Sequence, residues 1–231
     1  MNKIKIFSDG AVIDDIIAAN QSDTIQGITT NPTLMAKAGI KNYLDFCKDA
    51  LKIVKHKSFS LEVFSDEPNE IERQARLLSN LANNVYVKIP IVNSVGRSTL
   101  DSITKLSSEG IKINVTAVFT FTQIKDITTA LNKKVPSYIS IFAGRIADAG
   151  QDPEPFIRFC AENKNKNHEI IWASPREVFN VLQAQRSGAE IITATPDIIK
   201  KIKNFGKDLH EYSIETSKMF YDDAIKSKFN I

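Results

Sequence analysis

Eight short apolar segments, each followed by an amphipathic segment, constrain the fold of this chain more than any other feature of its sequence. The segments are rich in β-branched residues and begin near residues 4, 25, 59, 85, 112, 137, 169 and 189. Seven intervals separate residue 4 from residue 189, so the mean spacing is about 26 residues. Strands that are separated by helices of this length pair in parallel. Eight such units are the number that closes a (β/α)8 barrel of roughly 200–250 residues.

The amphipathic segments predict the helices of this fold. The expected helices cover residues 12–20, 43–54, 67–81, 98–108, 122–131, 155–163, 175–185 and 196–203. A doubly wound open sheet shows the same alternation, so counting strands does not separate it from a TIM barrel. No low-complexity segment or Pro/Gly-rich linker divides the chain, and we expect a single α/β domain. Residues 1–204 should form the barrel, and residues 205–231 an additional C-terminal helix of the same domain.

Composition and charge exclude several classes of protein. Hydrophobic residues make up 42% of the chain and the net charge is only +3, which excludes disorder as the main state. No apolar run is long enough to span a membrane, and acidic residues come too early in the chain for a signal peptide. The lysines are scattered and lack interleaved aromatic residues, so we expect no nucleic-acid partner. These features predict a cytoplasmic protein.

The cysteines and histidines predict neither a disulfide scaffold nor a metal site. Two cysteines, Cys47 and Cys160, suit free thiols in a reducing cytoplasm, although a single bridge between them stays possible. The three histidines, His56, His168 and His210, lie far apart, and none has a companion three or four residues away. We therefore expect no metal and no cofactor.

A lysine in the fourth strand is the sharpest functional signal. Active sites of (β/α)8 barrels lie where the strands end, and Lys88 stands in the apolar run VYVKIP. Burial favours the neutral form of an amine, which attacks carbonyl carbons and forms Schiff bases. The alternative is a lysine that reaches solvent at the strand end, or one that forms a structural ion pair with Glu62. The VKIP segment alone leaves both interpretations open.

Two carboxylates follow or interrupt other strands. Glu62 lies within the third strand and therefore needs a partner or a function, while Asp9 ends the first strand. Carboxylates beside a Schiff-base lysine supply the acid and base groups that move protons at substrate hydroxyls. Alternatively, Asp9 caps the next helix, because Asp-Gly before an amphipathic segment is a common helix start.

Two arginines follow the sixth and seventh strands and predict an anion site. Arg145 and Arg176 can converge on one phosphate, and Ser174 adds a hydroxyl donor. Ser174-Pro175-Arg176 also stands at an expected helix start, where backbone N–H groups favour anions. Late strands of this fold often carry such a site. The alternative is a pair of surface arginines with helical partners.

Seven segments of the chain, in order along nearly its whole length, resemble those of a known family. They are GITTNPTL (27–34), SLEV (60–63), VKIP (87–90), INVTAVFTFTQ (113–123), SIFAGRIAD (140–148), WASPREV (172–178) and ITATPDIIKK (192–201). The combination of TTNP and VKIP at this separation resembles the transaldolase family. The resemblance is to its small-subunit branch, which includes fructose-6-phosphate aldolase.

The resemblance implies a class I aldol mechanism in a (β/α)8 barrel. Lys88 matches the imine-forming lysine, Asp9 the proton-abstracting aspartate, and Glu62 an acid/base that acts through a water held by Thr116. The matching substrate contacts are Thr29, Asn31 and Asn114 around the imine and the donor hydroxyls, Ser140 at the dihydroxyacetone unit, and Arg145, Ser174 and Arg176 at the phosphate. The family also implies a homo-oligomer, a pentamer or decamer, and a place in the pentose phosphate pathway.

Glu62 and Phe142 follow the transaldolase pattern, whereas the similar aldolase branch carries glutamine and tyrosine there. We therefore expect an enzyme that transfers a dihydroxyacetone unit from fructose 6-phosphate or sedoheptulose 7-phosphate to an aldose phosphate. The alternatives are a fructose-6-phosphate aldolase that releases free dihydroxyacetone, and a non-catalytic barrel that binds sugar phosphates. One departure is Ala143-Gly144, where the family leads us to expect bulkier residues before the arginine.

Overall fold

A closed barrel of eight parallel strands forms the core of the computed structural model, which describes residues 4–229. The strands are β1 (Lys5–Asp9), β2 (Ile25–Thr29), β3 (Ser58–Glu62), β4 (Val85–Pro90), β5 (Ile113–Val118), β6 (Ser137–Ile141), β7 (His168–Trp172) and β8 (Ile191–Ala194). They pair in sequence order, and β1 closes the ring against β8, with Lys5 opposite Ile191. This closure confirms the TIM barrel and excludes the open sheet.

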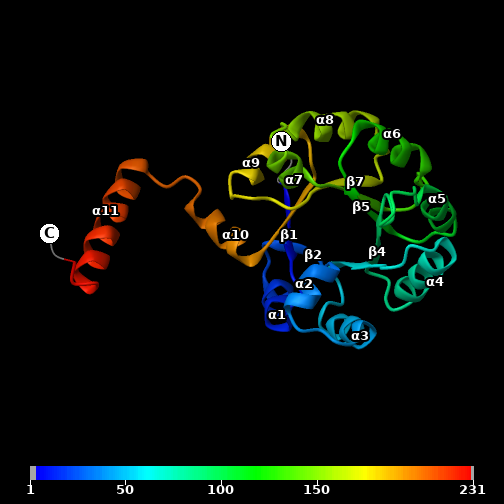
Figure 1. Cartoon of the computed structure of the whole chain (residues 1–231), viewed down its shortest axis with the longest axis horizontal. Helices are drawn as coiled ribbons and strands as arrows, with labels where there is room; N and C mark the ends of the chain where they lie inside the picture. Colours follow the sequence, from blue (N-terminus) through cyan, green and yellow to red (C-terminus); the bar gives the residue numbers. More distant parts are fainter. Residues whose placement is uncertain (1–3, 230–231) are drawn as a thin grey trace. The chain divides into compact units, whose positions relative to one another are not determined.

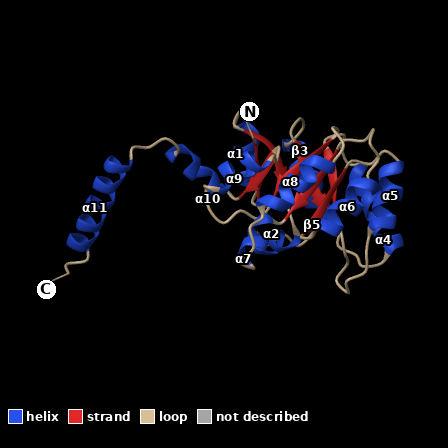
Figure 2. Ribbon diagram, turned by 90° about the horizontal axis from the view of Figure 1, so that it is seen from above, coloured by secondary structure: helices blue, strands red, loops and turns tan. Residues whose placement is uncertain are grey.

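Helices alternate with the strands and surround the barrel (Figures 1 and 2). Those that begin before residue 200 are α1 (Ile13–Gln21), α2 (Pro32–Lys37), α3 (Tyr43–Ile53), α4 (Pro68–Ser79), α5 (Leu100–Ser108), α6 (Phe121–Ala130), α7 (Ala143–Asp148), α8 (Glu154–Asn163), α9 (Asn180–Ser187) and α10 (Pro196–Lys200). The 3-10 helix η1 (Lys201–Asn204) and α11 (Leu209–Lys226) follow in the C-terminal part of the chain. The sequence did not predict α2 and α7. Both have six residues, too few for a helical period to be recognised.

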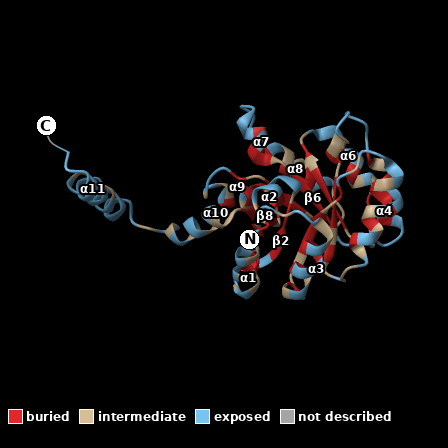
Figure 3. Ribbon diagram, turned by 60° about the horizontal axis from the view of Figure 1, so that its bottom comes forward, coloured by how far each residue is buried: buried red, intermediate tan, exposed pale blue. Residues whose placement is uncertain are grey.

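The strands are buried on both of their faces, as parallel sheets covered by helices must be (Figure 3). Aromatic rings fill the half of the barrel at the amino ends of the strands. Tyr138 stacks on Tyr86 with ring centroids 4.0 Å apart and meets the edge of Phe7 at 5.7 Å. A Cβ on Gly27 would lie 2.6 Å from the Phe7 ring, so this packing requires glycine there. Open space inside the barrel is therefore left to its carboxyl end.

The chain divides into a barrel unit that ends at Ile199 and a C-terminal unit that begins at Lys200. In the C-terminal unit, Asp208 caps α11 by accepting hydrogen bonds from two backbone N–H groups of the first turn. No residue of α11 is buried (Figure 3). The expected single domain with a boundary at residue 204 stays a prediction.

The two cysteines form no disulfide bridge. Cys47 and Cys160 are free and buried, and burial raises the pKa of each thiol to about 12. Within residues 4–229, no helix combines the length and the apolar character that crossing a membrane requires.

Candidate active site

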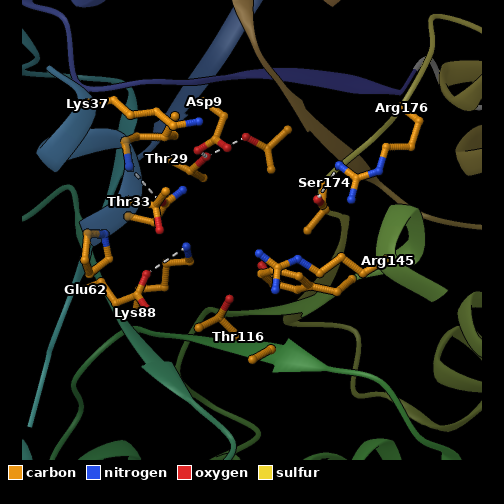
Figure 4. A pocket seen from close by; sticks show the side chains of 18 residues that line it. Asp9, Thr29, Thr33, Lys37, Glu62, Lys88, Thr116, Arg145, Ser174 and Arg176 are labelled. Carbon is orange, nitrogen blue, oxygen red and sulfur yellow. Dashed lines mark hydrogen bonds and ion pairs between the residues drawn. The ribbon is translucent and has the colours of Figure 1, made fainter. Parts of the chain in front are cut away.

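A pocket of about 500 Å³ opens at the carboxyl ends of the strands (Figure 4). Eleven of the twelve site residues expected from the sequence line it: Asp9, Thr29, Asn31, Glu62, Lys88, Thr116, Ser140, Phe142, Arg145, Ser174 and Arg176. The twelfth, Asn114, lies beneath the pocket wall. Residues that are as much as 167 positions apart in the chain therefore share one cavity.

Lys88 and Glu62 occupy paired positions on neighbouring strands and form an ion pair in the pocket. Glu62 on β3 is in register with Lys88 on β4, and their Oε2 and Nζ atoms are 3.0 Å apart. Nζ also donates a hydrogen bond to the backbone carbonyl of Thr30, at 3.1 Å. The Lys88 side chain is only 8% exposed, so it does not reach bulk solvent. The ion pair raised as the structural alternative is thus present, at the wall of the pocket.

Asp9 ends β1 and points into the same pocket (Figure 4). Thr29, its register partner on β2, donates a hydrogen bond to Asp9 Oδ1 at 2.7 Å. Burial of the carboxyl group raises the pKa of Asp9, while the charge of Lys88 and the Thr29 hydrogen bond act in the opposite direction. The helix-cap interpretation of Asp9 is wrong, because Val12 is the N-cap of α1 and no side chain caps that helix.

Two buried oxygens in the pocket wall have no hydrogen-bond partner among the described residues. They are Thr116 Oγ1 and Glu62 Oε2, whose contact with Lys88 has ion-pair distance but not hydrogen-bond alignment. Buried polar atoms are almost always hydrogen-bonded, so these two oxygens suit a ligand or water in the pocket. The backbone of Glu62 is held from outside the barrel, because Tyr43 Oη donates to its carbonyl at 2.7 Å.

Asn114 belongs to a buried hydrogen-bonded layer below the pocket. Its Nδ2 donates to Ser60 Oγ at 3.0 Å, and its Oδ1 accepts from Ser140 Oγ at 2.7 Å. These two bonds fix the orientation of the Asn114 amide and hold Ser140 in the pocket wall. The sequence offered no signal for Ser60, since a small polar residue within a strand is not distinctive.

Asn31 has a structural role that accounts for part of the TTNP motif. Its side-chain oxygen accepts a hydrogen bond from the backbone N–H of Leu34 and so caps α2, which Pro32 begins. The amide nitrogen of Asn31 is left for the pocket. The cap also brings Thr33 and Lys37 to the rim, two pocket residues that the sequence did not predict.

The arginines gather on one side of the pocket, across from Asp9 and Lys37 (Figure 4). Arg145 packs over the Phe142 ring, with its guanidinium carbon 5.5 Å from the ring centroid. Arg176 donates to Ser174 Oγ at 3.1 Å and forms an ion pair with Asp148. This ion pair lowers the pKa of Asp148. Both arginine side chains are exposed at the mouth, where an anionic group can reach them.

The expectation of a helix start at Ser174-Pro175-Arg176 is wrong. Helix α9 begins at Asn180, and the segment before it is a loop. The backbone N–H groups of Arg176 and Glu177 donate to Asn180 Oδ1, so they are already used. Anion binding here rests on side chains and not on a helix terminus.

A close backbone approach shapes the arginine side of the pocket. Ser174 has a φ of 60°, a left-handed conformation that is uncommon for residues other than glycine. A Cβ on Gly144 would lie 1.6 Å from the Ser174 carbonyl oxygen. Glycine is therefore required for α7 to pack against this loop, which explains why Gly144 stands where a bulkier residue was expected.

Thr193, at the end of β8, is a further pocket residue that was not predicted as part of the site. It is 5% exposed, and its Oγ1 lies 2.5 Å from Thr29 Oγ1. Its position near the carboxyl end of the eighth strand was the only available signal. Among residues 4–229, no group of three or more His, Cys, Asp or Glu residues is arranged to hold a metal ion.

Comparison with solved structures shows the same architecture in distant proteins. A sialic acid aldolase from Ruminococcus gnavus superposes with a TM-score of 0.59 at 9% identity, covering 83% of this chain and 68% of the other. An orotidine 5'-phosphate decarboxylase from Pyrococcus horikoshii OT3 gives 0.56 at 16% identity, covering 82% and 88%. At these identities the likeness concerns the fold alone.

Sequence comparisons give the family. A probable transaldolase from Thermoanaerobacter sp. (strain X514) is 35% identical over 202 residues, which cover 86% of this chain and 89% of that protein. One from Bartonella henselae is 31% identical over 231 residues, covering 99% and 100%. Residues 6–230 also match the family model described as Transaldolase/Fructose-6-phosphate aldolase. The chain therefore belongs to the transaldolase/fructose-6-phosphate aldolase family.

Proposed function

We propose that this enzyme is a class I transaldolase that moves a dihydroxyacetone unit from a ketose phosphate to an aldose phosphate through a Schiff base on Lys88. The observation that carries the proposal is the environment of the Lys88 amine. Lys88 Nζ lies 3.0 Å from Glu62 Oε2 in a pocket that Asp9 and two arginines also line. Fructose 6-phosphate and sedoheptulose 7-phosphate are the proposed donors.

The first half of the reaction joins Lys88 to the donor. Glu62 takes a proton from the ammonium, and neutral Nζ attacks the C2 carbonyl carbon of the ketose. The carbonyl oxygen leaves as water, and a protonated imine remains. Thr116, whose buried hydroxyl has no partner among the described residues, holds a water through which Glu62 exchanges these protons.

The second half breaks and remakes a carbon–carbon bond. Asp9 removes the proton of the C4 hydroxyl, an aldehyde forms at C4, and the C3–C4 electron pair moves into a C2–C3 enamine. C3 of the enamine then attacks the aldehyde carbon of an acceptor, and Asp9 returns its proton to the new hydroxyl oxygen. Hydrolysis of the imine releases the product ketose and regenerates Lys88.

The arginine side of the pocket is the proposed phosphate site. Arg145 and Arg176 are exposed at the mouth, opposite Asp9, so a phosphate bound there directs the sugar chain past Lys88 (Figure 4). Asp148 already holds Arg176 in place. Charge-assisted hydrogen bonds from guanidinium groups suit a phosphate dianion.

Phe142 favours transfer over simple cleavage. It lines the pocket and packs against Phe119 with centroids 5.6 Å apart, so this part of the wall is apolar. A wall without a hydroxyl offers no proton donor to the enamine at this position. The enamine therefore persists until an aldose phosphate arrives, which is the condition for transfer.

Borohydride trapping tests the proposal. Incubation with fructose 6-phosphate and borohydride should add one reduced dihydroxyacetone or hexose phosphate unit to Lys88, located by peptide mass mapping. Lys88→Ala should abolish the adduct, whereas Lys37→Met, which removes another pocket lysine, should retain it. A wild-type protein without an adduct, or with the adduct on Lys37, would contradict the mechanism.

We also propose that the enzyme is a homo-oligomer in the cytoplasm. Apolar residues of α11, among them Leu209, Tyr212, Met219 and Phe220, are each at least 42% exposed. Because most of the stability of a helix in a protein comes from packing of its apolar face, α11, which has no buried residue, needs a protein surface to pack on. A neighbouring subunit of a pentamer or decamer supplies one, and the two free cysteines suit a reducing compartment.

A further inference from the structure

We infer that Thr193 is a positioning residue that donates into a hydroxyl chain, Thr193–Thr29–Asp9, and thereby stabilises the carboxylate form of Asp9. The catalytic meaning of this chain rests on the proposed function, in which Asp9 is the base. The hydroxyl chain itself is inferred from distances within the barrel.

The chain joins the two strands on either side of the aspartate. β1 pairs with β2 and with β8, and Thr29 and Thr193 stand on these two neighbours. Their Oγ1 atoms are 2.5 Å apart, and Thr29 Oγ1 lies 2.7 Å from Asp9 Oδ1. Thr29 and Thr193 are 2% and 5% exposed, so solvent does not compete for either hydroxyl.

Counting protons determines which way these bonds run. A carboxylate only accepts hydrogen bonds, and each threonine hydroxyl has a single proton to donate. Thr29 gives its proton to Asp9, so the short contact between the two threonines must use the proton of Thr193. A hydroxyl that accepts a hydrogen bond becomes a stronger donor. Thr193 therefore strengthens the bond that Thr29 makes to the carboxylate.

The protonated acid uses the Thr193 hydroxyl differently. When Asp9 carries a proton it can donate to Thr29, which then donates to Thr193, so Thr193 only accepts and its own proton turns to the pocket that it lines. Hydrogen bonds that support a charged carboxylate are stronger than those between neutral groups. Loss of the Thr193 hydroxyl therefore weakens the carboxylate form more than the acid form.

The other charges around Asp9 do not replace this contribution. Lys88 on β4 favours the carboxylate, and burial opposes it. Glu62 on β3, Lys37 on α2, Arg145 on α7 and Arg176 in the loop after β7 complete the charged lining of the pocket. None of them is changed by removal of the Thr193 hydroxyl. The loss of that hydroxyl should therefore raise the pKa of Asp9.

Four variants separate the effect of the Thr193 hydroxyl from the effects of its methyl group and of removing a buried threonine hydroxyl elsewhere. Thr193→Val keeps the shape of the side chain without the donor, and Thr193→Ser keeps the donor without the methyl group. Thr99→Val is the matched control, since Thr99 is 6% exposed and donates to the Pro90 carbonyl outside the pocket. Thr193→Ala provides a second hydroxyl-free variant if the valine protein does not fold, as judged by thermal melting.

Two measurements separate failure of this inference from failure of the proposed function. The first is the ¹³C NMR titration of the Asp9 carboxyl carbon, assigned with Asp9→Asn, which requires no turnover. The second is the pH profile of kcat/KM for transfer. On the acid limb of this profile, Thr193→Val should lower kcat/KM by about two- to fivefold, because hydrogen bonds strengthen one another modestly. At the higher pH of the plateau, kcat/KM of the variant should equal that of the wild type.

The expected pattern is a higher Asp9 titration midpoint in Thr193→Val, with Thr193→Ser and Thr99→Val close to the wild type. An unchanged midpoint in Thr193→Val would overturn the inference, even if borohydride still traps Lys88. A midpoint that rises equally in Thr193→Ser would also overturn it, because the methyl group and not the hydroxyl would then matter. A wild type without transfer activity would remove the proposed function and leave the titration result valid.

Discussion

Substitution of Gly144 by alanine, which adds a single carbon atom, should disrupt the arginine side of the pocket. The added Cβ would lie 1.6 Å from the Ser174 carbonyl oxygen, whereas real Cβ contacts essentially never fall below 3.0 Å. Helix α7 and the loop after β7 must therefore separate by at least 1.4 Å. The strained φ of 60° at Ser174 and the Gly144 N–H bond to Ala173 O at 3.3 Å leave little room to adjust.

The expected loss follows from the residues that move. Arg145 lies on α7, while Ser174 and Arg176 lie in the displaced loop, so a phosphate cannot contact both sides at once. Loss of one charge-assisted hydrogen bond costs about 1.5–3 kcal/mol, or roughly 10- to 150-fold in affinity. Overpacking should also reduce the free energy of unfolding by about 1–3 kcal/mol.

Steady-state kinetics with phosphorylated and unphosphorylated sugars provide the assay. Gly144→Ala should raise KM for fructose 6-phosphate by about 10- to 150-fold and change kcat/KM for fructose itself much less. Gly10→Ala is the control, because a Cβ on Gly10 meets no atom within 4 Å and its φ is not positive. A Gly144→Ala enzyme with wild-type KM for the phosphate ester and wild-type urea midpoint would refute the reasoning.

Three further predictions concern the aspartate, the pocket wall and the C-terminal helix. Burial raises the pKa of Asp9 above 3.8, so folding stability falls as the pH rises from about 4 through the folded-state pKa. The free energy of unfolding of Asp9→Asn, measured with urea, should therefore rise relative to that of the wild type over this pH range. The total rise should be about 1.4 kcal/mol for each pH unit between the folded-state and unfolded-state pKa of Asp9, and a pH-independent difference would contradict this. Phe142→Tyr should raise acceptor-independent release of dihydroxyacetone by about tenfold or more, measured without aldose phosphate; unchanged release would reject Phe142 as the determinant. Phe220→Asp, which charges an exposed apolar residue of α11, should lower the mass measured by light scattering, and a wild-type mass would show that Phe220 is not at a subunit interface.

The pocket contains buried charged groups that reduce folding stability singly but partly offset one another's cost. A buried carboxyl and a buried amine are unfavourable alone, yet Lys88 opposes the effect of burial on Asp9 and forms an ion pair with Glu62. Removal of Lys88 would therefore leave burial less opposed and raise the pKa of Asp9 further. This coupling is why the titration of Asp9 is a more specific probe of the pocket than activity alone.

Much of the architecture was available from local sequence patterns. Short apolar runs alternate with amphipathic segments of helical period along the chain, and eight such pairs fit a (β/α)8 barrel, although closure of the sheet could not be read from the count. Polar residues in apolar strands, above all Lys88 in VYVKIP and Glu62 in SLEVF, marked the pocket because burying them is unfavourable without a partner. The short helices α2 and α7 were not predicted, since six residues show no clear helical period.

Sequence by itself thus determined the number of strand–helix units and the residue types at the strand ends, since both depend on neighbours within a few positions. Tertiary structure decided how those residues act on one another. Closure of β1 against β8 brings Thr193 to Thr29, which is 164 positions away, and so connects both to Asp9. The approach of Gly144 to Ser174 likewise exists only after the helices have packed. Such contacts leave no local pattern because their energies arise from distances that only the closed barrel sets.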